Sequence, residues 1–329
     1  MTQSNVESQP IVAVTRTVPG EMVVEGADVR TLGSGPPTRD GLIEFVRGAS
    51  VIVSMFSDAV DAELLDAAGP QLRGVCNFAV GYNNINMDAC AQRGVAVTNT
   101  PDAVTEGTAN MAWALLLATT RKLIAGDRYA RSGAWAEGGP IGMAEWMGMD
   151  ITGKTLLIVG AGRIGHAVAK RALGFGMRVL YVARSRKWDY ELAPMAAEWV
   201  SLDEGLQRAD VVSVHTPLTR ETRHQIGARE LGLMKPTAIL VNTARGPIVD
   251  EAALAEALQA GRLWGAGLDV FEDEPRVHPG LVGLDSVTMS PHIGSAEQRW
   301  REMMTQMVAD NAAAILRGER PPNLVASQR

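Results

Sequence analysis

The stretch Thr-Leu-Leu-Ile-Val-Gly-Ala-Gly-Arg-Ile-Gly, residues 155–165, decides the fold of this chain. Its apolar run ends at Val159, and Gly160, Gly162 and Gly165 follow in G-x-G-x-x-G spacing. In this pattern the first glycine permits a tight turn, the second lets a pyrophosphate approach the backbone, and the third lets a helix pack closely on the sheet. The helix N-terminus offers N–H groups to phosphates. Because a strand-like run precedes the glycines and an alanine-rich stretch, 166–173, follows them, the context favours a dinucleotide site over a plain tight turn.

Short β-branched runs alternate with helix-compatible stretches on both sides of this turn. Strands are expected at 11–15, 51–54, 72–77, 95–98, 178–183, 210–215, 238–243, 265–270 and 286–290, and helices at 39–47, 61–68, 105–122, 203–208, 251–260 and 296–316. Such alternation predicts an α/β fold with parallel sheets. We expect two doubly wound domains, one at 102–291 and a discontinuous one at 1–101 and 292–329, because the last helix should return to the first domain.

Composition and charge exclude several classes of protein. Of the 329 residues, 46% are apolar and 21% are charged, which is typical of a globular protein. The net charge of −6 argues against a nucleic-acid surface. The longest apolar run, 111–118, is too short to span a bilayer, and the polar residues 1–10 do not resemble a signal peptide. Cys76 and Cys90 lack metal or redox spacing, so we expect reduced thiols, no metal and a cytoplasmic location.

Chemically useful side chains follow three expected strands. Arg245 follows the run 238–243, Glu274 follows 265–270, and His292 follows 286–290. Each alone has a plain alternative: a surface ion pair, a solvated acidic turn or a structural histidine. Because ligands bind outside the carboxyl ends of parallel strands, the three together favour one site on the edge that carries the glycine turn.

This trio suits the reduction of a 2-oxo acid to a 2-hydroxy acid. The planar guanidinium of Arg245 can bind a carboxylate through two parallel hydrogen bonds. A histidine side chain titrates near neutrality, so His292 can give or take the alcohol proton. A carboxylate such as Glu274, hydrogen-bonded to an imidazole, raises its pKa and fixes its tautomer. A reduced nicotinamide would supply the hydride.

The motifs resemble those of the D-isomer-specific 2-hydroxyacid dehydrogenase family over nearly the whole chain. They are Val-Gly-Tyr-Asn-Asn-Ile at 80–85, Val-Thr-Asn-Thr-Pro at 97–101, the glycine turn, Asn-Thr-Ala-Arg-Gly at 242–246, Gly-Leu-Asp-Val-Phe-Glu-Asp-Glu-Pro at 267–275 and Pro-His-Ile-Gly-Ser at 291–295. The resemblance implies a Rossmann-type cofactor domain inserted into a flavodoxin-like substrate domain. Within the family, residues 102–106 and Trp146 are most similar to glyoxylate/hydroxypyruvate reductases.

The resemblance also implies roles for particular residues. Arg245 would bind substrate, Glu274 would support the histidine and His292 would donate the proton. Substrate would also contact Val80, Gly81 and Trp146. The expected cofactor-binding residues are Thr108, Gly160, Gly162, Arg163, Ile164, Gly165, Arg184, Ser185, Arg186, His215, Pro217, Thr243, Asp269 and Gly294.

The strand 178–183 lacks the acidic residue that would bind a ribose 2′-hydroxyl. Arg184, Ser185, Arg186 and Lys187 follow it instead. These residue types suit a 2′-phosphate, so we favour NADP(H). The alternative is a merely basic surface turn with NAD(H) as the cofactor.

The glycine- and tryptophan-rich segment 132–151 has little periodicity and is either an intrachain cover or a subunit contact. The resemblance favours a dimerisation arm, and hence a homodimer formed through the cofactor domain.

Three alternatives to a glyoxylate and hydroxypyruvate reductase stay open. The chain could act on phosphoglycerate or on a bulkier 2-oxo acid. It could also be a dinucleotide-sensing protein akin to the corepressors of this family.

Overall fold

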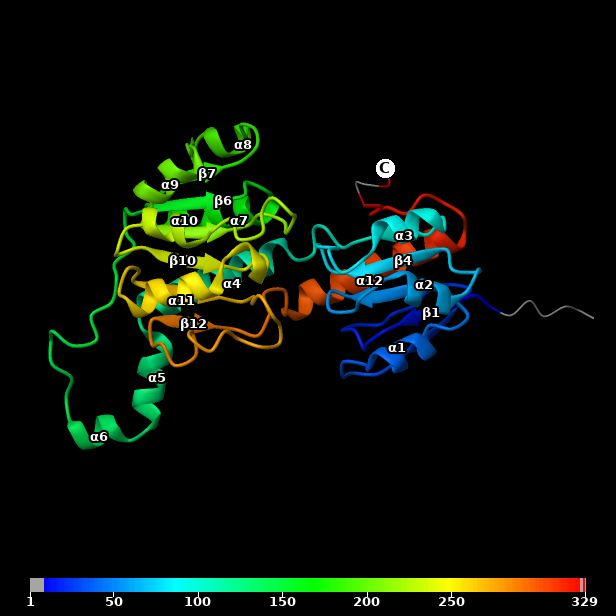
Figure 1. Ribbon diagram of the computed structural model, residues 1–329, viewed down its shortest axis with the longest axis horizontal. Coiled ribbons are helices and arrows are strands. Elements are labelled where there is room, and N and C mark those ends of the chain that lie inside the picture. The colour runs from blue at the N-terminus through cyan, green and yellow to red at the C-terminus, as the bar shows by residue number, and fades with distance from the viewer. Residues whose placement is uncertain (1–8, 326–327, 329) are drawn as a thin grey trace, which may run out of the picture. The chain divides into compact units, whose positions relative to one another are not determined.

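The computed structural model describes residues 9–325 and 328, which form two compact units (Figure 1). Unit 1 contains the described residues up to Val104 and those from Ala296 onward, and unit 2 contains Thr105–Ser295. Both boundaries lie a few residues after the expected ones. The first helix of unit 2 begins only at Thr105, and the turn around His292 stays with the sheet of unit 2.

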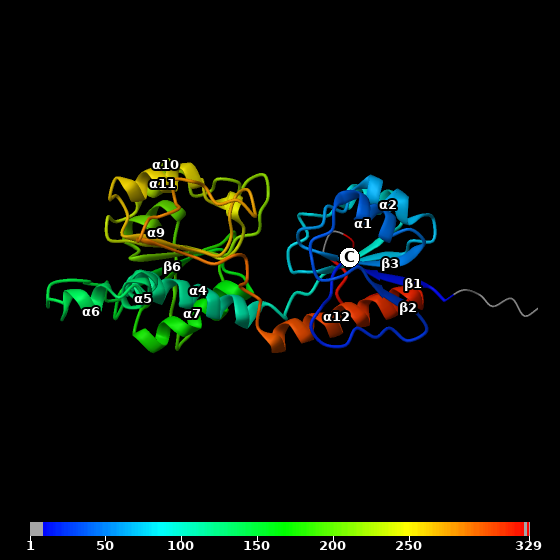
Figure 2. The same ribbon diagram turned by 90° about the horizontal axis from the view of Figure 1, so that it is seen from below.

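Unit 1 is built on a five-stranded parallel sheet of order β2-β1-β3-β4-β5, the flavodoxin-like order. Its strands are β1 (Ile11–Val14), β2 (Asp28–Thr31), β3 (Ala49–Met55), β4 (Gly74–Phe78) and β5 (Ala96–Thr98), and its helices are α1 (Arg39–Phe45), α2 (Ala62–Ala68), α3 (Met87–Gln92) and α12 (Gln298–Leu316). Figure 2 shows α1 and α2 on one face of the sheet and α12 on the other. The last helix therefore packs with the first strands, against β3, β4 and β5.

Unit 2 is built on a seven-stranded parallel sheet of order β12-β11-β10-β9-β6-β7-β8. Its strands are β6 (Thr155–Val159), β7 (Arg178–Val182), β8 (Glu198–Trp199), β9 (Val211–Val214), β10 (Ile239–Asn242), β11 (Gly265–Leu268) and β12 (Val287–Met289). The strand order reverses between β6 and β9, as it does in Rossmann-type sheets. The predicted α/β class with two doubly wound parallel sheets is confirmed.

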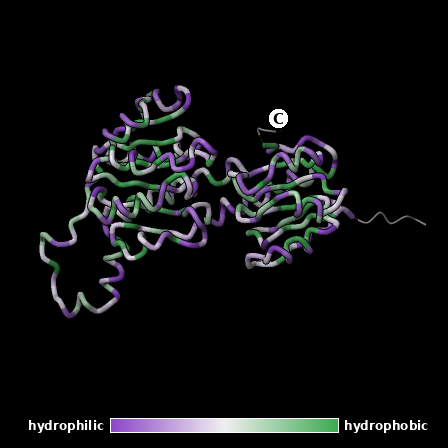
Figure 3. Tube along the Cα trace, in the orientation of Figure 1, coloured by the Kyte–Doolittle hydropathy of each residue, from purple (hydrophilic) through white to green (hydrophobic). Residues whose placement is uncertain are grey.

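Helices cover both faces of this second sheet. The helices of unit 2 are α4 (Thr105–Thr120), α5 (Leu123–Arg131), α6 (Ala134–Gly138), α7 (Arg163–Ala172), α8 (Trp188–Glu191), α9 (Leu202–Arg208), α10 (Ala228–Leu233) and α11 (Glu251–Gln259), with short 3₁₀ turns at Leu173–Phe175 and Gly246–Ile248. In Figure 2, α4 and α7 lie on one face, and α9, α10 and α11 lie on the other. Both faces of the inner strands are therefore buried, which explains their continuous apolar sequences (Figure 3).

Alternate residues of β6 enter two separate hydrophobic cores. Leu157 and Val159 pack under α9 and α11, whereas Leu156 and Ile158 pack under α4 and α7.

Several helices begin at a residue whose side chain accepts a hydrogen bond from a backbone N–H of the first turn. The carboxylate of Asp61, for example, accepts from Leu64 N–H.

The apolar helix α4 is buried by elements of its own unit. It packs on α7, β10, β11 and β12. Trp113 stacks on Phe175 with 4.8 Å between ring centroids, and its indole N–H donates to Val168 O at 3.0 Å. Elements of unit 2 itself therefore cover this helix.

The thiols of Cys76 and Cys90 are free and buried. Burial raises the pKa of Cys76 to about 12 and that of Cys90 to about 11, so both stay protonated at neutral pH. Within the described residues no His, Cys, Asp and Glu side chains cluster as a metal site. None of the helices in that part of the chain has the length and apolar character needed to cross a membrane.

Each of the three positions in the glycine turn needs a glycine for a different steric reason. A Cβ on Gly160, whose φ is +101°, would lie 2.6 Å from Thr216 N, where β6 and β9 diverge. A Cβ on Gly165 would lie 2.7 Å from Gly160 O and 2.8 Å from Ile158 Cγ2. A Cβ on Gly162 would meet no protein atom within 4 Å. Gly160 and Gly165 thus serve packing, whereas Gly162 borders open space at the N-terminus of α7.

Two alanine substitutions separate these roles. Gly165→Ala is expected to lower the free energy of unfolding by roughly 1–3 kcal/mol, because its methyl group overlaps backbone. Gly162→Ala should fold normally but bind a dinucleotide at least about tenfold more weakly, because its methyl group enters the space that a pyrophosphate needs. Urea unfolding and fluorescence titration measure the two effects.

Gly174→Ala is the control, because its Cβ would also meet nothing within 4 Å and it lies away from the turn. It should change neither quantity. Wild-type dinucleotide affinity in Gly162→Ala would contradict the assignment of this turn to phosphate binding.

Candidate active site

Three neighbouring strands of unit 2 end in the expected catalytic residues. β10, β11 and β12 are adjacent and parallel, and their carboxyl ends lead into the loops that carry Arg245, Glu274 and His292. The loops after β10 and β11 are in close contact, since a Cβ on Gly246 would lie only 1.9 Å from Phe271 O. No other residue type fits at Gly246 without moving one of these loops.

His292 and Glu274 form a hydrogen-bonded pair. The distance from His292 Nδ1 to Glu274 Oε2 is 2.7 Å, and the two side chains are 21% and 29% exposed. The other carboxylate oxygen of Glu274 accepts from Phe271 N–H at 3.0 Å. Burial opposes ionisation of this carboxyl, but the bond to His292, the bond from Phe271 and the charges of His292 and Arg245 hold its pKa below its ordinary value. Glu274 is therefore a carboxylate at neutral pH and can fix the imidazole tautomer.

The backbone at His292 is held in place by a buried carboxylate. His292 adopts a left-handed conformation with φ of +53°. Asp269 Oδ1 accepts from Ser290 Oγ at 2.6 Å and from Ile293 N–H at 2.9 Å, and Asp269 Oδ2 accepts from Gly294 N–H at 2.7 Å. Asp269 is also one of the expected cofactor-binding residues, and that role stays a prediction. In the structure its carboxylate organises the histidine turn.

Arg245 is positioned by an asparagine that the sequence analysis did not single out. Asn242 Nδ2 donates to Arg245 O at 3.0 Å, and Asn242 Oδ1 accepts from Ala244 N–H at 3.0 Å. Burial lowers the pKa of Arg245, and the charge of Glu274 opposes that shift. An arginine pKa is so high that the side chain stays cationic. A polar residue in the last position of a buried strand was the available signal for Asn242.

Several expected cofactor residues lie around the glycine turn or on the same sheet edge. Burial lowers the pKa of His215 to about 3, so this imidazole is neutral at pH 7; its Nε2 lies 2.8 Å from Ser213 Oγ. Thr243 Oγ1 is buried and has no hydrogen-bond partner among the residues that the structure describes. An unpartnered buried hydroxyl and the open space at Gly162 both fit a bound dinucleotide. Thr108 is buried on α4, Arg163 and Ile164 begin α7, and Pro217 follows β9.

The basic loop after β7 is partly committed to an internal ion pair. Both carboxylate oxygens of Glu191 accept from Arg186, and Glu191 Oε1 also accepts from Tyr181 Oη at 2.5 Å. Arg186 stacks on Trp188 as well. Arg184 and Ser185 are exposed. Of the expected 2′-phosphate residues, Arg184 and Ser185 are thus the more available.

Trp146 does not join the trio within one chain. It has a left-handed backbone in the segment between α6 and β6, and its ring lies 5.2 Å from that of Tyr129. Together with Trp264 and Ser286 it lines a hollow at the amino ends of β11 and β12. The trio lies at the carboxyl ends of these strands, so the expected contact of Trp146 with substrate is not made inside unit 2. Val80 and Gly81 lie in unit 1, directly after β4.

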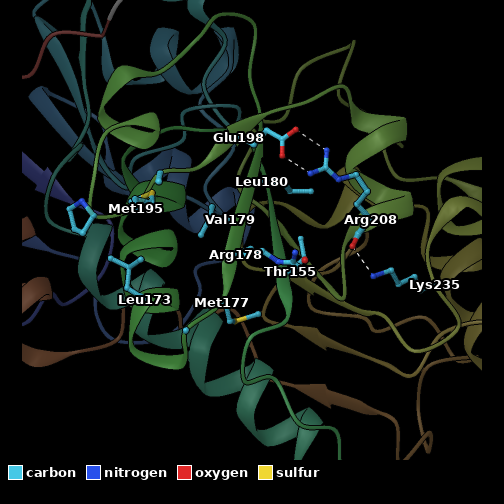
Figure 4. A pocket seen from close by; sticks show the side chains of 13 residues that line it. Thr155, Leu173, Met177, Arg178, Val179, Leu180, Met195, Glu198, Arg208 and Lys235 are labelled. Atoms are coloured by element: carbon cyan, nitrogen blue, oxygen red, sulfur yellow. Dashed lines mark hydrogen bonds and ion pairs between the residues drawn. The ribbon is translucent and has the colours of Figure 1, made fainter.

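A further pocket lies at the amino edge of β6, β7 and β8 (Figure 4). Arg208 pairs there with Glu198, and Lys235 donates to Arg208 O at 2.7 Å. None of the expected site residues lines it. Arg208 and Lys235 thus hold helix ends to the ends of strands.

Comparison with known proteins places the geometry in a family. Residues 113–294 match the D-isomer specific 2-hydroxyacid dehydrogenase NAD-binding domain. The chain is 48% identical over 326 residues to a glyoxylate reductase of Thermococcus onnurineus, with 96% of each chain covered.

Solved structures of similar proteins support the same family. A protein from Thermus thermophilus has a TM-score of 0.89 at 42% identity, with 96% of this chain and 100% of that chain covered. An NADPH-dependent glyoxylate/hydroxypyruvate reductase from Sinorhizobium meliloti, in complex with NADP and malonate, has a TM-score of 0.81 at 32% identity, with 97% of each chain covered. With its cofactor turn and its Arg–Glu–His edge, the chain belongs to the D-isomer specific 2-hydroxyacid dehydrogenase family of NAD(P)-dependent oxidoreductases.

Proposed function

We propose that this chain reduces glyoxylate and hydroxypyruvate to the corresponding 2-hydroxy acids, with NADPH as the preferred cofactor and His292 as the proton donor. The observation that carries the proposal is the His292–Glu274 pair beside Arg245 at the carboxyl edge of a dinucleotide-binding sheet. The names of the relatives support the choice of substrate.

Residues of the chain account for substrate binding, polarisation of the carbonyl group and donation of the proton. A reduced nicotinamide, when bound, would supply the hydride for the carbonyl carbon of the 2-oxo acid. Arg245 binds the substrate and polarises its carbonyl, which favours negative charge on the carbonyl oxygen. His292 then gives a proton to that oxygen. Since Glu274 engages Nδ1, the proton would leave from Nε2.

His292→Ala is expected to lower kcat by about 10²–10⁴-fold while cofactor affinity stays within about twofold, because the residue acts on a proton and not on the dinucleotide. Steady-state kinetics and cofactor titration measure the two quantities.

His224→Ala is a matched control, since His224 also pairs with a carboxylate, that of Glu272, at 2.8 Å. It should keep near-wild-type kcat. Equal activity of wild type and His292→Ala would remove the proton-donor role. A wild-type protein that binds NADPH but turns over no 2-oxo acid would favour a dinucleotide-sensing protein, and a preference for phosphoglycerate or bulkier acids would change the substrate class.

Cofactor preference rests on the loop after β7. That strand ends without an acid, and Arg184 and Ser185 are exposed beyond it. We expect the double variant Arg184→Ala/Ser185→Ala to raise the KM for NADPH at least about tenfold and to change the KM for NADH little, because only NADPH carries the 2′-phosphate. Lys170→Ala, which removes a positive charge from the last turn of α7, is the control. Equal losses for both cofactors would contradict the NADP(H) preference.

We further propose that the chain is a cytoplasmic homodimer joined through the arm that projects from unit 2 (Figure 1). The arm displays Trp135, Ile141, Met143 and Met147 to solvent, and Met143 is 97% exposed. Apolar surface of this kind is typical of subunit contacts. The buried free thiols are compatible with a reducing compartment.

Charge on the arm should weaken the dimer. Met143→Asp/Met147→Asp is expected to raise the dimer dissociation constant by at least about 10²-fold, because two carboxylates would be buried at the contact. Sedimentation velocity over a range of concentrations measures this. Val282→Asp, at an exposed apolar residue away from the arm, should leave the association unchanged. A wild-type protein that is monomeric at micromolar concentration would contradict the proposal.

A further inference from the structure

Three successive carbonyl groups after β4 each accept a hydrogen bond from unit 1. Thr100 N–H donates to Ala79 O at 3.0 Å. Asn99 Nδ2 donates to Val80 O at 2.8 Å, and Asn77 Nδ2 donates to Gly81 O at 2.7 Å. The donors come from β4 itself and from the residues that follow its neighbour β5. Three consecutive carbonyl groups of this glycine-containing loop are therefore fixed.

Further hydrogen bonds hold the side chain of Asn77 and the backbone of Asn99. Asn77 is fully buried, and its Oδ1 accepts from Ser54 Oγ at 3.1 Å, which directs its NH₂ group toward Gly81. The backbone N–H of Asn99 donates to Asn323 O at 3.3 Å. Neither residue belongs to the catalytic trio, and both lie within unit 1.

Peptide planarity transmits this anchoring to the next N–H group. In a trans peptide the C=O and the following N–H point in opposite directions. The only cis peptides in the described chain precede Pro194 and Pro275. Fixing the carbonyls of Ala79, Val80 and Gly81 therefore directs the N–H groups of Val80, Gly81 and Tyr82 away from the anchoring side chains.

These three N–H groups have no acceptor in the part of the chain that the structure describes. Successive N–H groups without acceptors form a favourable site for an anion. We propose that Asn77 and Asn99 are positioning residues that aim the N–H groups of Gly81 and Tyr82 at the carboxylate of a 2-oxo acid, with Thr100 N–H doing the same for Val80. This inference rests on the proposed reduction of 2-oxo acids and extends it to side chains that do not touch the substrate.

The test removes one anchor and measures carboxylate affinity. Asn99→Ala is expected to raise the KM for glyoxylate and the dissociation constant of oxamate, a non-reducible 2-oxo carboxylate, about tenfold, because a charge-assisted hydrogen bond is weakened. The KM for the nicotinamide cofactor should not change, and kcat should fall less than about twofold. Asn77→Ala is expected to act in the same direction, and Asn99→Gln, which retains the amide donor, should lose less affinity.

Asn86→Ala provides the matched control. Asn86 begins α3 by accepting from Ala89 N–H at 3.0 Å and makes no bond to the loop of residues 79–82. It should lower thermal stability without changing either affinity. Wild-type oxamate affinity in Asn99→Ala, or an equal loss of oxamate and cofactor affinity, would overturn the inference while wild-type turnover of glyoxylate leaves the proposed function standing. A wild-type protein that reduces no 2-oxo acid would contradict both.

Discussion

The geometry of the active edge depends on one buried carboxylate. Asp269 is almost completely buried, and its two oxygens accept three hydrogen bonds from the turn that contains His292. A buried carboxylate is costly unless such donors satisfy it. With them, it holds His292 in a backbone conformation that residues with a Cβ rarely adopt. The imidazole consequently reaches Glu274, which comes from the neighbouring strand end.

Much of this arrangement follows from the sequence because parallel strands bring distant residues to one edge. Arg245, Glu274 and His292 could be grouped once their preceding strands were recognised, and the strand order then made those strands neighbours. The glycine turn was equally readable, since Gly160 and Gly165 answer steric demands that no other residue meets and Gly162 leaves open the space that a phosphate would need.

The sequence was less informative where tertiary contacts decide the role of a residue. The edge strand β2 has charged, partly exposed residues and no apolar run, and α5 is a helix without a buried residue. The structural role of Asp269 could not be predicted, because hydrogen bonds to a turn some twenty residues away leave no pattern in sequence. The ion pair of Arg186 with Glu191 could not be predicted, because Glu191 lies beyond the motif. The position of Trp146 at the amino ends of β11 and β12 could not be predicted either, because no local sequence pattern records the path of the arm that carries it.

The order of the two units along the chain also constrains how the protein folds during its synthesis. A Cβ on Gly74 of β4 would lie 2.6 Å from Ile315 Cδ1 of α12, so the last helix packs directly on a strand near the start of the chain. During synthesis the first hundred or so residues leave the ribosome without the helix that covers one face of their sheet. Unit 2 is continuous in sequence and holds all the parts of its own two cores. The unit that is synthesised first is therefore the last that can be completed, and its exposed apolar sheet face has to be kept from other chains until the end of translation.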